Sequence, residues 1–365
     1  MNIILIILVF GVIIFFHELG HFIVAKINHI TVKEFSMGFG PKLFQFHKKE
    51  TQYTLRLIPL GGYCMMLSED DEENENDENS FEKKSIWARM AVVLAGPAMN
   101  FVIAFLLSMV IIHFCGSDPA IIGAVYNKDN IEKYQIENAE EYFNGVYPAE
   151  EAGISDGDQV LKIEGSTVKN FRELQIYLQI YGDGSPIDLT LEKEDGTVYD
   201  TTVHPAKTPD GYKIGIMSVG YQLPKNFGEL CKYSAYETRY WVKATFLSLK
   251  LIVTRQVSSD EVSGPVGVAK NMNDTFNEAA KSSVLDLFLN WMNYIVLLSA
   301  NLGVMNLLPI PGLDGGRFIF LLIEAVTRKK VPKDKENIVT LIGFVLVMLL
   351  MVVILFNDIK NVFFH

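Results

Sequence analysis

The 365-residue sequence has few cysteines and no excess of positive charge. Cys64, Cys115 and Cys231 form no CxxC pair and no disulfide framework, and the sequence leaves open whether Cys115 and Cys231 pair. Acidic residues outnumber lysine and arginine by 43 to 32, which gives a formal net charge of −11. A surface of that charge argues against nucleic acid as a partner.

Charged residues are scarce in four long apolar runs, although they make up 21% of the chain. Each run reaches the roughly 20 residues that a membrane span needs. The first is too long for a cleavable signal peptide and lacks both a basic region before it and a small-residue cleavage site after it. We expect a mostly α-helical polytopic membrane protein with spans at 2–25, 86–114, 284–308 and 338–356.

The segments between the spans differ in charge and length. Segments 26–85 and 317–336 are short and rich in lysine and arginine, so both should lie in the cytoplasm. The block from Gly116 to Ser283 then lies outside, in a multi-pass protein of the cell's inner (plasma) membrane. The expected plan is a membrane domain at 1–114 and 284–365, an outer folded domain at 116–216 and an amphipathic linker at 217–283.

Three of the polar segments have interpretable patterns. Residues 32–60 are rich in β-formers and predict a hairpin, either folded back toward the membrane with an edge for an extended substrate or an ordinary cytoplasmic hairpin. The acidic run 68–80 is typical of a solvated, flexible loop, and its role stays open. Residues 227–257 suit a helix at the outer membrane interface or a surface helix on the outer domain.

The stretch "VIIFFHELGHFIVAK" places two histidines and a glutamate inside the first apolar run. His17 and His21 share one helical face, with Glu18 beside them. Zinc needs neutral imidazole ligands, and a zinc-bound water needs a carboxylate to take its proton. HExxH supplies both on one turn. Because ionisable groups inside a membrane are costly, we expect a metal site here, with Glu18 as the base.

A catalytic zinc takes three protein ligands, so a third must come from elsewhere in the chain. Asp286 lies at the outer edge of the third span, and Glu324 sits close to Arg328 and is expected to be a surface partner. Asp314, in "NLLPIPGLDGGRF", can reach the depth of the histidines. The prolines and glycines around it favour irregular backbone, which a membrane tolerates only where protein or water covers it. Asn306 adds a donor and an acceptor just before the break.

Taken together, these motifs resemble the site-2 protease family of intramembrane zinc metalloproteases, in the bacterial branch that carries periplasmic PDZ domains. The resemblance covers nearly the whole chain. It implies zinc held by His17, His21 and Asp314, Glu18 as base, and Asn306 in contact with substrate or the developing oxyanion. It also implies a membrane-associated β element at 32–60. The matching stretches are "FFHELGHF", "FSMGFGPKLF", "IPLGGYCMM", "AGPAMNF", "VSGPVGVAK" and "NLGVMNLLPIPGLDGGRF".

The outer block contains one segment with a recognisable pattern. Residues 146–168 predict a short helix, a Gly-Asp turn and an apolar strand that ends at a glycine turn. This looks like the middle of a PDZ domain of the permuted bacterial type, β-rich α+β, which starts near Ala120. PDZ domains bind peptides by adding a strand to a sheet edge. Only one such domain is found, so regulation by a tandem pair does not carry over.

We therefore expect a zinc-dependent metalloendopeptidase with its site toward the cytoplasmic side of the bilayer. Its partners would be single-span membrane proteins as substrates, such as an anti-sigma factor or a signal-peptide remnant, and a possible PDZ peptide ligand. The alternatives are a zinc transporter, which does not explain Glu18 beside the first histidine, and a PDZ-based scaffold, which does not explain the zinc set.

Overall fold

The computed structural model describes residues 2–67, 77–128, 143, 145–254 and 264–364. The chain forms two compact units, one made of residues 1–108 and 245–365 and the other of residues 109–244. Most of the described residues are helical. The fold of each unit follows from where the apolar runs and the β-forming segments lie.

Four helices among the described residues are long and apolar enough to cross a membrane, as the sequence predicts. The first has no polar stripe, because nearly all of its residues are apolar, as expected of a helix in lipid. The fourth extends beyond the predicted 338–356, because Asp334 and Glu336 lie in its first turn, where the helix dipole favours acidic residues. These helices are α1 (Asn2–Ile27), α2 (Ile86–Cys115), α8 (Val284–Leu307) and α10 (Lys333–Phe364).

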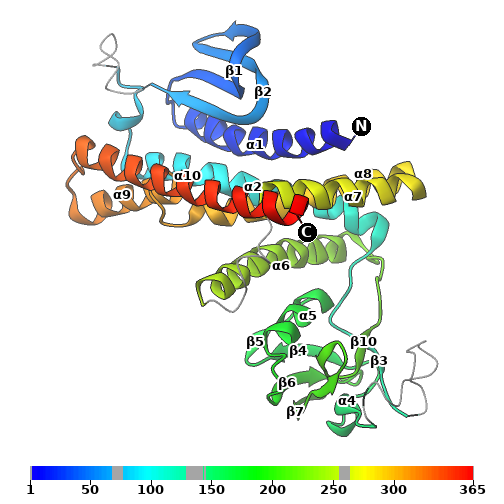
Figure 1. Ribbon diagram of the computed structural model, residues 1–365. Coiled ribbons are helices and arrows are strands. Elements are labelled where there is room, and N and C mark those ends of the chain that lie inside the picture. The colour runs from blue at the N-terminus through cyan, green and yellow to red at the C-terminus, as the bar shows by residue number, and fades with distance from the viewer. Residues whose placement is uncertain (1, 68–76, 129–142, 144, 255–263, 365) are drawn as a thin grey trace. The chain divides into compact units, whose positions relative to one another are not determined.

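A hairpin of β1 (Val32–Lys48) and β2 (Thr51–Met66) lies along α1 (Figure 1). Phe35 pairs with both Cys64 and Tyr53, so the first half of β1 lies between the two halves of β2. The second half of β1 pairs only with the first half of β2 and is exposed. The hairpin is followed by residues 68–76, which include most of the predicted acidic loop and lie outside the described residues.

The non-helical segment after α8 determines where the next helix begins. Pro309 and Pro311 stop α8, and Gly312 adopts the left-handed φ of +96° that reverses the chain. The helix α9 (Asp314–Thr327) then begins directly against this segment. A Cβ atom at Gly315 would lie 2.1 Å from the Leu308 carbonyl oxygen, so only glycine permits this approach. Asp314 is thereby fixed as the first residue of α9.

Two further elements complete the first unit, η1 (Phe81–Lys83) and α7 (Pro265–Ser282). Gly264 is the N-cap of α7, and Asp358 of α10 accepts hydrogen bonds from the backbone N–H groups of Gly264, Val266 and Gly267 at 2.8 to 2.9 Å. Asp358 is 4% exposed, so a buried carboxylate caps the N-terminus of α7. The α7 helix packs on α8 and α1 through Phe276 and Met272, both fully buried.

The second unit is a small α+β fold. Its main sheet has the order β5-β4-β6-β7, and α5 begins at an N-cap, Asn170, whose side chain accepts a hydrogen bond from the Glu173 backbone. Two smaller sheets have two strands each, β10 with β3 and β8 with β9. The elements are β3 (Ile122–Val125), α4 (Pro148–Glu151), β4 (Gln159–Ile163), β5 (Ser166–Thr167), α5 (Phe171–Ile180), β6 (Ile187–Glu192), β7 (Val198–Val203), β8 (Ala206–Thr208), β9 (Gly211–Lys213) and β10 (Ile216–Ser218).

The linker after β10 forms one long helix, α6 (Phe227–Val253). Its first part binds the second unit through ion pairs: Glu237 pairs with Arg172, and Arg239 and Lys243 pair with Glu173. These contacts agree with a surface helix on the folded domain, one of the two sequence interpretations of residues 227–257, and the membrane-interface interpretation stays a prediction. Cys64 and Cys231 are free thiols.

Candidate metal centre

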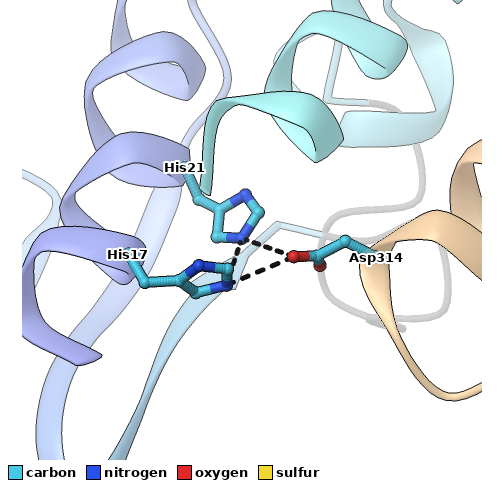
Figure 2. A group of neighbouring side chains, drawn as sticks. All are labelled: His17, His21 and Asp314. Carbon is cyan, nitrogen blue, oxygen red and sulfur yellow. Dashed lines mark hydrogen bonds and ion pairs between the residues drawn. The ribbon is translucent and has the colours of Figure 1, made fainter. Parts of the chain in front are cut away.

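Three side chains from two elements distant in sequence converge in the first unit (Figure 2). His17 and His21 come from α1, and Asp314 comes from the first turn of α9. The two Nε2 atoms are 3.3 Å apart, and Asp314 Oδ2 lies 3.2 Å from His17 Nε2 and 3.5 Å from His21 Nε2. Both histidines are buried, at 7% and 8% exposed. Among the described residues, this is the one group of His, Cys, Asp and Glu that could hold a metal ion.

The opposite edge of each imidazole is held by α2. His21 Nδ1 donates to the Val92 carbonyl oxygen at 2.8 Å, so Nε2 of the neutral ring carries a lone pair. His17 Nδ1 lies 3.2 Å from the amide of Asn100, which is fully buried. Asn100 Nδ2 is the atom that faces His17 Nδ1, and Asn100 Oδ1 is buried without a hydrogen bond from the described residues. With the two amide atoms exchanged, Oδ1 would accept the Nδ1–H of His17 and leave Nε2 free to bind. Both rings then present electron pairs to the same point.

These distances fit a zinc ion. Ligands at about 2.05 Å from zinc in a tetrahedron are separated by about 3.3 Å. The three observed separations of 3.2 to 3.5 Å match that edge. Asp314 Oδ2 is buried and receives no hydrogen bond from the described residues. Three electron-pair donors facing one another without a shared proton repel, and a cation among them removes the repulsion.

The α1 and α2 helices approach closely enough only because two residues lack side chains. A Cβ atom at Gly20 would lie 2.2 Å from the Ala95 carbonyl oxygen. One at Gly96 would lie 2.2 Å from His21 Nε2 and 2.8 Å from His17 Cε1. Gly96 therefore leaves the space into which the two rings turn.

Glu18 lies beside the hairpin. Its carboxylate lies near the backbone N–H of Cys64. A Cβ atom at Gly62 would lie 3.2 Å from Glu18 Cγ and 3.2 Å from the Ile14 side chain. The end of β2 thus runs along the face of α1 that carries the glutamate. It pairs with β1 on its other side.

The structure also shows the positions of the other residues that the sequence analysis considered. Asn306 Nδ2 lies 3.3 Å from His17 Nε2, at the rim of the metal centre. Asp286 lies in the first turn of α8, away from the group. The prediction that Glu324 is a surface partner of Arg328 is wrong. Glu324 pairs with Arg89, which is close in space but 235 residues away in sequence.

Sequence reasoning from the residues missed Val92, Gly96 and Asn100. They support the histidines across a packing interface, and these contacts depend on how α1 and α2 pack. A usable signal was the Gly-Pro pair inside an apolar run, since glycine in a helix interior costs about 1 kcal/mol relative to alanine and needs a reason.

Comparisons with known proteins give one family. The family model described as "Peptidase family M50" matches residues 5–350. The chain is 38% identical to a Clostridium acetobutylicum protein named as a candidate zinc metalloprotease, over 98% of this chain and 97% of that protein. It is 32% identical to the zinc metalloprotease RasP of Geobacillus kaustophilus (99% and 98% covered) and 30% identical to the regulator of sigma-W protease RasP of Bacillus subtilis (98% and 98%).

Proposed function

The chain belongs to peptidase family M50, the site-2 protease family of zinc metalloproteases, and we propose that it cuts peptide bonds within or next to transmembrane segments of single-span membrane proteins. The observation that carries the proposal is the convergence of Asp314 on His17 and His21 at 3.2 to 3.5 Å, with both histidines inside a helix long enough to span a membrane. A soluble protease would not need its site in such a helix.

In this proposal His17, His21 and Asp314 hold the zinc ion. When bound, zinc lowers the pKa of a water toward about 7 and polarises a carbonyl that approaches it. The Glu18 carboxylate takes the proton from the attacking water and passes it to the leaving nitrogen. Asn306, beside His17, donates to the substrate carbonyl as negative charge develops on its oxygen. The carbonyl of Val92 and the amide of Asn100 keep both imidazoles oriented.

A peptide bond in a helix is shielded by its own hydrogen bonds, so the substrate must be held extended. The end of β2, from Gly62 to Met66, passes Glu18 and is the edge we propose for it. Lys26 pairs with Glu50 at one end of the hairpin, and Gly62 contacts Ile14 at the other. Twelve residues of helix rise about 18 Å, so the hairpin descends along α1 by that depth.

The orientation in the membrane rests on charge. Lysine and arginine gather in segments 26–85 and 317–336, which we place in the cytoplasm of a cell bounded by this inner membrane. The second unit then lies outside. His17 is 15 residues from Asn2, about 22 Å along the helix, which puts the site in the cytoplasmic half of a core about 30 Å thick.

We propose that the second unit is a PDZ domain that binds a peptide. A groove of about 780 Å³ lies between α5 and the segment 210–216, lined by Phe171, Leu178 and Ile214 among others. The β10 strand pairs with β3 on one edge, and no strand of the described residues pairs with its other edge, which we propose receives an added strand. A groove of this kind favours an extended peptide over a folded partner.

For the substrate, the name of the Bacillus subtilis relative describes a regulator of sigma-W. By analogy we propose a single-span anti-sigma factor as one substrate of this chain, with signal-peptide remnants as another class. A zinc transporter would also place histidine and aspartate in spans. It does not account for Glu18 beside the metal ligands or for the strand edge that passes it.

The test is zinc content and cleavage measured together. Glu18→Gln should retain about one zinc per protein and lose cleavage of a single-span substrate, because the amide cannot accept the proton. Asp314→Ala should lose both, because two imidazoles leave the shell incomplete. Cleavage by Glu18→Gln at the unchanged rate would refute the assignment of the base. Normal zinc in Asp314→Ala would refute the third ligand.

A further inference from the structure

A bidentate ion pair joins α2 and α9. Arg89 Nη1 donates to Glu324 Oε2 at 3.0 Å, and Nη2 donates to Oε1 at 2.6 Å. The side chains are 8% and 16% exposed. Two parallel bonds from a planar guanidinium to a carboxylate fix both the distance and the rotation between the groups. The pair therefore joins the two helices in one defined geometry.

The arginine belongs to the face of α2 that builds the site. Arg89, Val92, Gly96 and Asn100 follow one another at intervals of three and four residues, the spacing of a single helical face. Val92 holds His21, Gly96 leaves room for both rings, and Asn100 lies against His17. Any shift of this face moves the supports of the two histidines.

The glutamate belongs to the helix that carries the third ligand. Asp314 is the first residue of α9, and Glu324 lies ten residues later, about 15 Å along the axis. A helix of this length moves as a rod. Leu321 and Phe318 of α9 belong to the same apolar cluster as Met90 and Val93 of α2, but apolar side chains alone tolerate sliding and rotation. The ion pair, in contrast, fixes both the distance and the rotation of α9 relative to α2.

We propose that Arg89 and Glu324 are positioning residues of the metal centre, which set the place of Asp314 relative to the two histidines. The proposal rests on the ligand set proposed above. The fork between the guanidinium and the carboxylate locks α9 against α2, and this lock holds the Asp314 oxygen at 3.2 to 3.5 Å from both Nε2 atoms. The side chains that bind a metal must be held within about 0.5 Å of their positions. If the ion pair is lost and α9 shifts, zinc therefore binds more weakly although all three ligands are still present.

The test uses two single variants and their exchange. Glu324→Gln keeps the shape of the side chain but loses its charge, and Arg89→Lys keeps a charge but loses the fork. Competition with a chelator should show zinc affinity reduced by about 10- to 100-fold in each, the range for residues that orient metal ligands. With saturating zinc, kcat should fall while KM for a single-span substrate stays within about twofold, because substrate contacts are unchanged. The exchanged protein, Arg89→Glu with Glu324→Arg, should recover part of the zinc affinity.

A matched control separates positioning from loss of stability. Phe276→Leu loosens a different apolar cluster of the same unit, which contains none of the three ligands. Its zinc affinity and kcat should stay near those of the unchanged protein at a similar loss of thermal stability. Equal loss of zinc in Phe276→Leu and Glu324→Gln would overturn the proposal. So would an exchanged protein as stable as the unchanged one that binds zinc no better than the single variants.

The Asp314→Ala variant, measured in the same series, distinguishes an error in the ligand set from an error in the positioning role. If Asp314→Ala loses zinc while Glu324→Gln keeps it, the ligand set stands and the positioning role is wrong. If Asp314→Ala binds zinc like the unchanged protein, the ligand set itself is wrong, and the positioning role falls with it.

Discussion

Gly96→Ala is a small change whose effect follows from the geometry of the metal centre. The new Cβ atom would lie 2.2 Å from His21 Nε2 and 2.6 Å from His21 Cε1, whereas ordinary contact begins near 3.4 Å. The His21 ring must therefore retreat by about 1.2 Å, or α2 must move away from α1. Metal sites tolerate a displacement of about 0.5 Å, so either response should break the ligand geometry.

Helix propensity alone predicts that Gly96→Ala stabilises the protein, whereas the geometry of the metal centre predicts that it weakens zinc binding. Alanine in place of glycine inside a helix contributes about 1 kcal/mol to the free energy of unfolding. Overpacking at a tight contact costs about 1 to 3 kcal/mol, so the net change in stability should be small. Zinc affinity should nevertheless fall by 100-fold or more, above the roughly 10- to 100-fold seen when only an orienting partner is lost. Function should fail in a protein that remains folded.

The assay is zinc retained by purified protein against a graded chelator, beside thermal unfolding and cleavage of a single-span substrate. Gly228→Ala in α6 is the matched control, because its nearest neighbour is Asn226 Oδ1 at 3.2 Å and no metal ligand lies nearby. Zinc affinity and cleavage within about twofold of the unchanged protein in Gly96→Ala would refute the close approach of α2 to the histidines, with twofold corresponding to about 0.4 kcal/mol.

Three further outcomes follow from other parts of the chain. Asp358→Leu leaves three backbone N–H groups without their acceptor, so the free energy of unfolding should fall by roughly 3 to 5 kcal/mol; heat inactivation that matches the unchanged protein would argue against the cap. An impermeant thiol reagent added outside cells should label a cysteine placed at Gly184 and miss one placed at Asn76, and the reverse pattern would overturn the orientation. Leu178→Arg should abolish binding of a peptide with an apolar C-terminal residue, measured by fluorescence anisotropy on the whole protein; unchanged affinity would exclude the α5 groove.

How far sequence reasoning reached depends on whether a feature is local. His17 and His21 share a face by helical spacing alone, so their proximity could be predicted without a fold. Asp314 needed one more step, the expectation that the broken segment reaches the depth of the histidines, and the structure brings it within 3.5 Å of both. The four spanning helices were equally accessible, because lipid demands long apolar runs.

The features that sequence reasoning missed are contacts between helices. Glu324 was assigned to Arg328, four residues away, because neighbours in sequence are the only partners that a sequence displays. Arg328 instead ends α9 in a left-handed conformation, and the carboxylate turns to Arg89 on another helix. Asn100 was likewise invisible as a partner of His17, because its role depends on how α1 and α2 pack. The double pairing of β1 with both halves of β2 also depends on tertiary contacts rather than on the β-forming pattern.

The most direct test of the central claim is the position of the cut. The purified protein, reconstituted in liposomes with zinc and a single-span substrate, should release fragments whose new ends, read by mass spectrometry, lie within or next to the transmembrane segment. The Glu18→Gln protein, loaded with zinc to the same level, should leave the substrate intact. Fragments cut only in the extramembrane part, or identical fragments from Glu18→Gln, would contradict the account of an intramembrane site built on His17, His21 and Asp314.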